Sequence, residues 1–233
     1  MTQGPYCKID IVFCVDVTGS MQPFINSVKS FILKFPDDLI NKHLQQGKIV
    51  DQIRVRVVAF GDYKTDTNAI NASPFYAKLP AEQNSEFNYF VSELRANGSG
   101  EPKSGLEALS VAMCSDWVLD GDRQRHIVVM FTDASAHPLE DRVGEVPAAF
   151  ASQIPSSIDK LTDGWEGGGQ SASGFATTIR QPARRLVLFA PDMYPWPAIG
   201  DSWQQTVFLP SKAGDGLAEV EYDNLLQKLS TGI

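Results

Sequence analysis

Three oxygen-bearing side chains alternate with other residues near the start of the chain. Asp16, Thr18 and Ser20 follow an apolar run and precede a long amphipathic stretch. We therefore expect one carboxylate and two hydroxyls in a loop where a strand is followed by a helix. Oxygen ligands bind hard cations better than they bind softer metals. The pattern predicts a site for Mg²⁺, with Mn²⁺ or Ca²⁺ as alternatives.

A second aspartate follows another strand-like run. Residues 126–131 are mainly apolar and lead directly into Thr132 and Asp133. Ligands of an open α/β sheet bind beyond the carboxyl ends of its strands, so Asp133 is expected beside Asp16. The simpler interpretation is that a hydroxyl of the first segment only caps a helix while Asp16 ends a strand. The matching position of Asp133 favours a single metal site.

These positions require a sheet whose strands alternate with helices. Runs rich in Val, Ile, Leu and Phe predict strands of a parallel sheet covered on both faces, and apolar residues three and four apart predict helices. Residues 74–79 alternate in polarity and predict an edge strand in a hairpin after Gly61 and Asp62. The expected fold is α/β and doubly wound, with a mostly parallel central sheet, one antiparallel edge strand and helices on both faces. The other expected strands are residues 8–15, 53–60, 126–131, 185–190 and 207–209, and the expected helices are 21–35, 85–96, 106–118, 156–165 and 221–229.

The region after residue 140 differs in composition from the rest. Residues 140–180 contain three consecutive glycines and several Ser and Ala residues around one expected helix. We interpret this region as a long surface insertion or lid on a single domain that spans residues 1–233.

The bulk composition is that of an ordinary globular protein. The 233 residues suffice for one large domain, and 28 acidic against 20 basic residues disfavour nucleic acid or an anionic membrane as partner. No apolar run reaches the length of a membrane span, and we expect no signal peptide. Cys7, Cys14 and Cys114 are odd in number and are expected to be reduced, buried thiols. The expected location is cytoplasmic.

With these residues in place, the chain resembles a von Willebrand factor type A domain of the bacterial intracellular type. That family carries a metal-ion-dependent adhesion site. The site is built from Asp-x-Ser/Thr-x-Ser after the first strand, a Thr or Asp in a middle loop, and an Asp after the fourth strand. Asp16, Thr18 and Ser20 match the first element, and Asp133 matches the last. The resemblance covers roughly residues 8–190 and is weaker after residue 140.

The middle element departs from the family pattern. Many bacterial relatives read Gly-Gly-Gly-Asp-x-Pro-Glu before a helix, whereas residues 97–103 read NGSGEPK and place Gly100 at the aspartate position. Ser99 or Glu101 would supply the missing oxygen if the loop shifts by one residue, or a water would fill the position. We favour Ser99, because its neutral hydroxyl resembles the family's threonine. A simple turn that opens a helix, with Pro102 in its first turn, satisfies the same residues.

The resemblance implies a binding mechanism for the site. The hydroxyls of Thr18 and Ser20 would bind the ion directly, while Asp16 and Asp133 would bind it or hold its waters. Few anionic ligands leave the ion electrophilic, and one open position of an octahedral cation would accept a partner's Asp or Glu carboxylate. The resemblance therefore implies a non-enzymatic protein-binding module, working beside an ATPase, kinase or phosphatase system.

Two other functions stay open. A metal-assisted hydrolase would use Asp133 or Asp62 as its base, but it needs more carboxylates around the ion than the sequence places there. A scaffold that has lost its metal is the other, because Gly100 removes an expected ligand. Phosphate-loop and nucleophile-elbow signatures are absent from the sequence.

Asp62 and His137 are further candidates at the same edge of the sheet. Asp62 follows the strand at 53–60 and is interpreted as part of a turn, with a place near the metal or on the partner-facing rim as the alternative. His137 lies shortly after Asp133. We expect a hydrogen bond within its loop, with a pH-sensitive role as the alternative.

Overall fold

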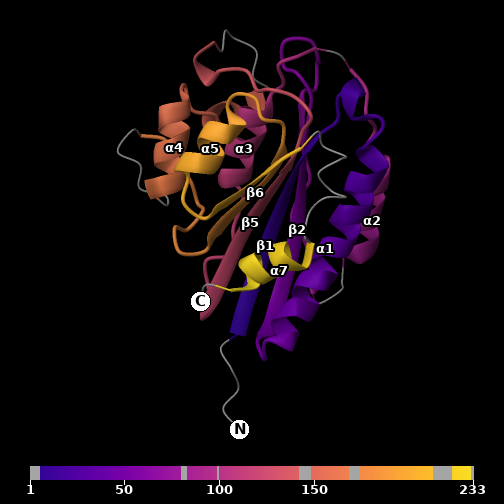
Figure 1. The fold of residues 1–233 in the computed structure, drawn as a ribbon, viewed down its shortest axis with the longest axis vertical. Coiled ribbons are helices and arrows are strands. Elements are labelled where there is room, and N and C mark those ends of the chain that lie inside the picture. Colours follow the sequence, from indigo (N-terminus) through magenta and orange to yellow (C-terminus); the bar gives the residue numbers. More distant parts are fainter. Residues whose placement is uncertain are drawn as a thin grey trace.

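The computed structural model of the chain describes residues 6–79, 83–98, 100–141, 148–167, 174–211 and 222–231. Its strands form one sheet with the order β3-β2-β1-β5-β6-β7, and β4 also pairs with β2 (Figure 1). The strands are β1 (Tyr6–Asp16), β2 (Ile49–Phe60), β3 (Ile70–Ala72), β4 (Tyr76–Leu79), β5 (Arg123–Phe131), β6 (Arg184–Ala190) and β7 (Thr206–Pro210). The helices are α1 (Ile25–Gln45), α2 (Asn84–Glu93), α3 (Gly105–Met113), α4 (Ile158–Gly167), α5 (Trp196–Ser202) and α7 (Tyr222–Ser230), with 3-10 turns η1 (Gly19–Met21), η2 (Leu139–Asp141) and η3 (Ala148–Gln153).

The sheet is parallel except at one edge. β1 lies between β2 and β5 and pairs with both in parallel, and β6 and β7 continue this arrangement. The short strands β3 and β4 both run antiparallel to β2. The expected doubly wound α/β class is therefore confirmed, and its antiparallel edge is divided between two short strands.

Alternate residues of the central strands enter two different cores. Ile11 and Phe13 of β1 pack on the side covered by α1, α2 and α7, whereas Val12 and Cys14 pack on the side covered by α3, α4 and α5. Figure 1 shows α1 and α2 on the opposite side of the sheet from α4 and α5. Because both faces are covered, the strands are apolar along most of their length toward their carboxyl ends, which is why their sequence runs are so distinct.

Helix α1 extends beyond the residues that its periodic pattern predicts. The pattern indicates a helix over 21–35, but α1 continues through Pro36 as far as Gln45. Phe35, Leu39 and His43 are buried on one side of this helix. Burying that apolar face outweighs the main-chain hydrogen bond that Pro36 cannot donate.

The described part of the segment 140–180 contributes to the core. Residues 142–147 and 168–173 lie outside the described residues. The helix expected at 156–165 is α4, and its Leu161 and Trp165 are fully buried in the cluster that also holds α3 and α5. Helix α4 is thus part of the layer that covers this face of the sheet.

Two general expectations concern membranes and thiols. Within the described ranges, no helix combines the length and the apolar character needed to cross a bilayer. Cys7, Cys14 and Cys114 are free thiols; Cys7 and Cys14 are buried as expected, whereas Cys114 is only partly buried. Partial burial raises the pKa of the Cys114 thiol to about 11.

A buried aspartate ties the two central strands to the loop after α3. Asp10 of β1 is fully buried and accepts hydrogen bonds from Nε and Nη2 of Arg54 in β2, at 2.8 and 2.7 Å. The main-chain N–H of Val118 donates to the same carboxylate at 2.6 Å. Forked Arg–carboxylate pairing with a further donor satisfies a charge that would otherwise be costly inside a sheet.

His126 of β5 is a second buried titratable group, and its hydrogen bonds fix its neutral form. The main-chain N–H of Arg180 donates to Nδ1 at 3.1 Å, so Nε2 carries the proton and donates to the carbonyl of Val118 at 2.9 Å. The imidazole stacks on Trp117, with ring centroids 4.9 Å apart. Burial lowers the pKa of His126 to about 4.

We expect the free energy of unfolding to rise between about pH 5 and about pH 7. Because the pKa of His126 is about 4 in the folded chain, the unfolded chain binds a proton at pH 5 that the folded chain does not. This difference lowers stability by about 2 kcal/mol at pH 5 relative to pH 7. Urea denaturation at the two pH values measures it. His126→Gln should reduce the pH dependence by about that amount, and an equal dependence in both proteins would contradict the assignment.

Candidate metal site

Three main-chain contacts fix the loop between β1 and α1. The N–H of Val17 donates to Phe60 O at the end of β2, at 2.9 Å. The N–H of Asn97 donates to Val17 O at 2.8 Å, and the N–H of Gly19 donates to Gly98 O at 3.3 Å. The first loop is therefore held between the end of β2 and the loop that leads toward α3.

The carboxylate of Asp16 organises the inner part of this loop. Asp16 and Thr18 are both fully buried. Asp16 Oδ1 accepts hydrogen bonds from the N–H and the hydroxyl of Thr18, at 2.9 and 2.7 Å. The hydroxyl of Thr132, at the end of β5, donates to Asp16 Oδ2 at 2.8 Å. Asp16 thus joins the loop after β1 to the loop after β5.

Ser20 and Asp133 extend this set toward the surface. Thr18 Oγ1 lies 3.2 Å from Ser20 Oγ, which in turn donates to Asp133 Oδ1 at 2.9 Å. Asp16, Thr18, Ser20 and Asp133 therefore form one continuous series of neighbouring oxygens, as the convergence of two strand ends predicts. Ser99, the remaining expected ligand, lies outside the described residues.

The spacing of these oxygens suits a small octahedral cation. Mg²⁺ bonds oxygen at about 2.0 to 2.1 Å, so neighbouring ligands of its octahedron lie about 2.9 Å apart. The separations of Ser20 Oγ from Thr18 Oγ1 and Asp133 Oδ1, 3.2 and 2.9 Å, are close to that value. Within the described part of the chain, no group of three His, Cys, Asp or Glu side chains is placed to hold a metal. A metal here would therefore depend on hydroxyl ligands and only two carboxylates.

The charge of Asp16 is unfavourable in the folded chain. Burial raises the pKa of this carboxyl, the hydrogen bonds from Thr18 and Thr132 lower it, and the charge of Asp133 raises it further. A divalent cation beside the two carboxylates would oppose both unfavourable effects, because an opposite charge nearby favours the ionised form.

A pocket of about 320 Å³ opens above the series of oxygens. Ser20 is exposed and Asp133 is half-buried, and both line this pocket. The side-chain oxygens of Ser20 and Asp133 can therefore be reached from solvent. Its other lining residues are Gly19, Gly98, Gly100, Glu101, Lys103 and Ala134.

Glycine is required at two positions of the middle loop because acidic side chains press against it. Gly98 and Gly100 have φ values of +84° and +113°, which favour glycine. A Cβ on Gly100 would lie 2.6 Å from Asp62 Oδ2, and a Cβ on Gly98 would lie 3.0 Å from Asp66 Oδ1. An aspartate at position 100 therefore has no room unless the carboxylate of Asp62 moves.

Asp62 forms the turn that its sequence context favours. Its side chain accepts a hydrogen bond from the N–H of Lys64, and its own N–H donates to Asp66 Oδ2. His137 Nε2 lies 2.9 Å from Asp62 Oδ1, and both side chains are buried. His137 thus makes a hydrogen bond within the loops, and Asp62 supports the middle loop without lining the pocket.

Three residues beside the site were not expected from the sequence. Thr132 donates a hydrogen bond to Asp16. Its position directly before Asp133 is the sequence feature that could have indicated this role. The indole N–H of Trp196 donates to Ala134 O at 2.8 Å and so fixes the loop that carries Asp133. Lys103 is buried, lines the pocket and donates a hydrogen bond to Gly100 O. The sequence feature that could have indicated Lys103 is that a lysine stands where the von Willebrand factor type A pattern has glutamate.

Comparison with known proteins supports the fold and one distant relationship. No family model matches the sequence. The alpha-protein kinase vwkA of Dictyostelium discoideum is 29% identical over 159 residues, which are 66% of this chain and 23% of that protein. The chain therefore spans less than a quarter of the length of this relative.

A pilus adhesin and a minor pilin are among the solved structures with a similar fold. The pilus adhesin SpaC of Lactobacillus rhamnosus GG has a TM-score of 0.53 at 10% identity, over 96% of this chain and 30% of that one. A mutant of the PilB minor pilin of Streptococcus sanguinis has a TM-score of 0.50 at 10% identity, over 99% of this chain and 62% of that one. At such identities the likeness shows the fold alone.

Replacing Gly100 by alanine should destabilise the fold more than the same change at Gly47. Both glycines have positive φ, so each alanine carries a backbone cost of about 1 kcal/mol. A Cβ at Gly47 meets nothing within 4 Å, whereas the one at Gly100 collides with Asp62. Gly100→Ala should therefore lose about 1 to 2 kcal/mol more in chemical denaturation. Equal losses at the two positions would mean that Asp62 does not press on the middle loop.

Proposed function

We propose that this chain is a non-enzymatic protein-binding module that captures an Asp or Glu side chain of a partner through a divalent cation. Mg²⁺ is the proposed ion, with Mn²⁺ or Ca²⁺ as alternatives. The observation that carries the proposal is the continuous series of oxygens from Asp16 through Thr18 and Ser20 to Asp133. When bound, the ion supplies an electrophilic position for a carboxylate.

Each residue of the series has a separate task in this proposal. The buried Asp16 orients the loop through Thr18 and adds negative charge beneath the ion. Ser20 and Asp133 present oxygens to the open pocket, where an incoming side chain has access. Without a cation, the negative charges of Asp16 and Asp133 would repel an incoming carboxylate. This repulsion supports a metal-dependent mode of capture.

The proposed partner is another protein, in a cytoplasmic setting, and it belongs to an ATPase, kinase or phosphatase system. The distant similarity to an alpha-protein kinase supports a setting of this kind. The excess of acidic residues, 28 against 20 basic, argues against nucleic acid or an anionic membrane.

A scaffold that binds no metal is the alternative, and Lys103 favours it. The buried lysine places a positive charge at the pocket where the family pattern has a negative one. An ammonium group is able to attract a carboxylate without any ion. Calorimetric titration separates the two functions, because no heat with Mg²⁺ or Mn²⁺ up to millimolar concentrations would favour the scaffold.

Ser20→Ala should weaken the binding of Mn²⁺ by at least about tenfold, because it removes one oxygen of the proposed set. Ser30→Ala is the matched control, since Ser30 is also exposed and donates only to the main chain of α1. Titration calorimetry with Mn²⁺ measures both affinities. If the two variants bind Mn²⁺ equally well, Ser20 is not a ligand and the proposed site is incorrect.

Partner capture should depend on both the ion and Asp16. We expect a protein that co-purifies with the wild-type chain to be lost in excess chelator and in Asp16→Ala, while Ser30→Ala keeps it. Circular dichroism should first establish that Asp16→Ala is folded. Capture that survives both the chelator and a folded Asp16→Ala variant would refute metal-dependent recognition. Mg²⁺-dependent hydrolysis of phosphate esters, lost in the same variant, would indicate an enzyme instead.

A further inference from the structure

A buried lysine lies beside the candidate metal site. Lys103 is only 3% exposed, and it lines the same pocket of about 320 Å³ as Ser20 and Asp133. The von Willebrand factor type A pattern has a glutamate at this position, whereas this chain has a lysine. The middle loop therefore contributes a positive charge to the pocket where that pattern has a negative one.

The main chain of Lys103 is fixed to the loop that carries Asp133. The N–H of Lys103 donates to Ser135 O at 3.0 Å, and its carbonyl accepts a hydrogen bond from the N–H of His137 at 2.9 Å. These contacts make a parallel bridge between Lys103 and Ala136. Lys103 is therefore held next to the loop that supplies one of the proposed ligands.

The ammonium group of Lys103 has donors to spare. Its Nζ donates to Gly100 O, but an ammonium group carries three N–H donors. Across the residues that the structure describes, Lys103 takes part in no ion pair. A buried charge without an opposite charge is unfavourable, so an anion that enters the pocket would lower its energy.

The charges around the pocket determine how Lys103 acts on each ligand of the site. A divalent cation would balance the negative charges of Asp16 and Asp133, and Lys103 would then leave a positive charge in excess. Glu101 also lines the pocket, but it is exposed, so water and salt screen its charge. The charge of Lys103 should therefore repel the cation and attract the carboxylate that follows it.

The simplest alternative is that Lys103 only supports the middle loop. Its hydrogen bond to Gly100 O and the positive φ of Gly100 fit such a role. Support of this kind needs a donor at position 103 but needs no charge. The two roles therefore predict different results for Lys103→Gln, which keeps an N–H donor and removes the charge.

We infer that Lys103 determines the specificity of the metal site, because it lowers the affinity for the cation alone and raises the affinity for an acidic side chain. This inference rests on the proposed function. The ammonium repels a cation in the open pocket and attracts the same carboxylate that the cation attracts. A neutral amide such as the side chain of Asn or Gln gains nothing from this charge. The site thus holds the cation weakly until an acidic partner binds with it.

The first measurement concerns the cation alone. In carboxylate-free buffer, Lys103→Gln should bind Mn²⁺ about threefold to tenfold more tightly than the wild-type chain, because one repulsive charge has been removed. Titration calorimetry measures both affinities, and circular dichroism first establishes that the variant is folded.

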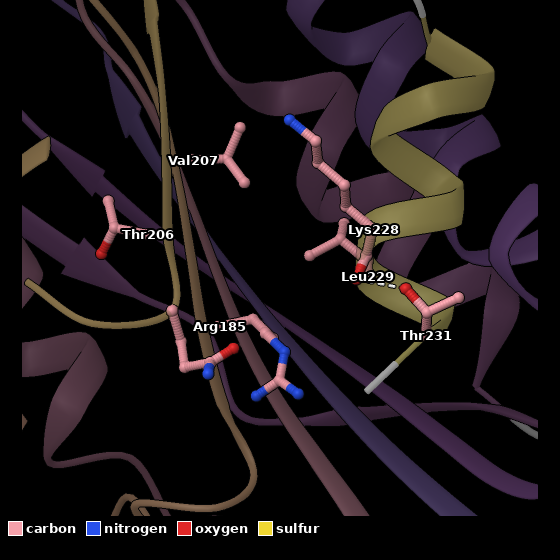
Figure 2. Close-up of a pocket in the computed structure, with 7 residues that line it drawn as sticks. Arg185, Thr206, Val207, Lys228, Leu229 and Thr231 are labelled. Carbon is pink, nitrogen blue, oxygen red and sulfur yellow. Dashed lines mark hydrogen bonds between the residues drawn. The ribbon is translucent and has the colours of Figure 1, made fainter. Parts of the chain in front are cut away.

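Lys228→Gln is the matched control for the loss of one positive charge. Lys228 is exposed on α7 and lines a different pocket, at the start of β6 and β7, where Figure 2 shows it beside Val207 and Leu229. The metal site lies beyond the opposite ends of the parallel strands, so solvent screens the charge of Lys228 from it. Lys228→Gln should bind Mn²⁺ as the wild-type chain does.

The second measurement concerns the carboxylate. The Mg²⁺-saturated chain is titrated with acetate, and with acetamide and sodium chloride as controls, at constant ionic strength. We expect acetate alone to give saturable NMR shifts of the Gly100 and Ala134 amides, which line the pocket. Lys103→Gln should weaken acetate by about threefold to tenfold, because one attractive charge is lost. Lys228→Gln should leave the affinity for acetate unchanged.

Opposite changes in Lys103→Gln, tighter Mn²⁺ and weaker acetate, support the inference. Unchanged affinities, or a weakening of both, overturn it and leave the metal site in place. A wild-type chain that binds no Mn²⁺, or that binds acetate equally well in excess chelator, overturns the metal-dependent function as well. If Lys103→Gln is not folded, the wild-type chain supplies the test. Acetate must then shift the Cε–Hε signal of Lys103 in excess Mg²⁺, and an unchanged signal overturns the inference.

Discussion

The hydrogen bonds to the buried carboxylate of Asp16 are the interactions on which the candidate site depends. Removing a carboxylate from water is unfavourable unless donors replace its hydration. Thr18 supplies two of these donors and Thr132 supplies a third, from a different strand end. The need to satisfy one buried charge therefore determines the shape of the first loop and the position of the loop that carries Asp133.

The middle loop is shaped by a different requirement, which is space. The carboxylates of Asp62 and Asp66 occupy the volume that side chains at Gly100 and Gly98 would need. Asp62 is itself held by His137 and by the turn that follows β2. Glycine at position 100, where the von Willebrand factor type A pattern has aspartate, thus fits the local space, because a neighbouring loop already fills it with an acidic side chain.

Much of this architecture could be predicted from periodicity. The central strands, the helices that cover them and the convergence of Asp16 with Asp133 follow from apolar runs and from the geometry of parallel sheets. Strand β3 and helix α5 are too short to produce a periodic signal. The continuation of α1 past Pro36 depends on tertiary burial, which local propensity does not contain.

One part of the site that sequence reasoning missed comes from a distant segment. Trp196 reaches the loop of Asp133 from a helix that begins more than fifty residues later. Asp62, which the sequence places in a turn, approaches Gly100 of the middle loop through a contact that only the folded chain creates. Patterns within one segment predict which groups are present, but packing between segments decides which of them share a pocket.

The small set of neighbouring oxygens from Thr18, Ser20 and Asp133 has a consequence for the ion that the proposed site would select. These oxygens already lie 2.9 to 3.2 Å apart before any ion enters, so the loops need little rearrangement. Ca²⁺, with bonds of about 2.3 to 2.6 Å and six to eight ligands, would need more oxygens than these side chains supply, whereas Mg²⁺ keeps several of its waters. The proposed site would therefore favour the smaller ion, because a cation that retains its waters needs few ligands from the protein.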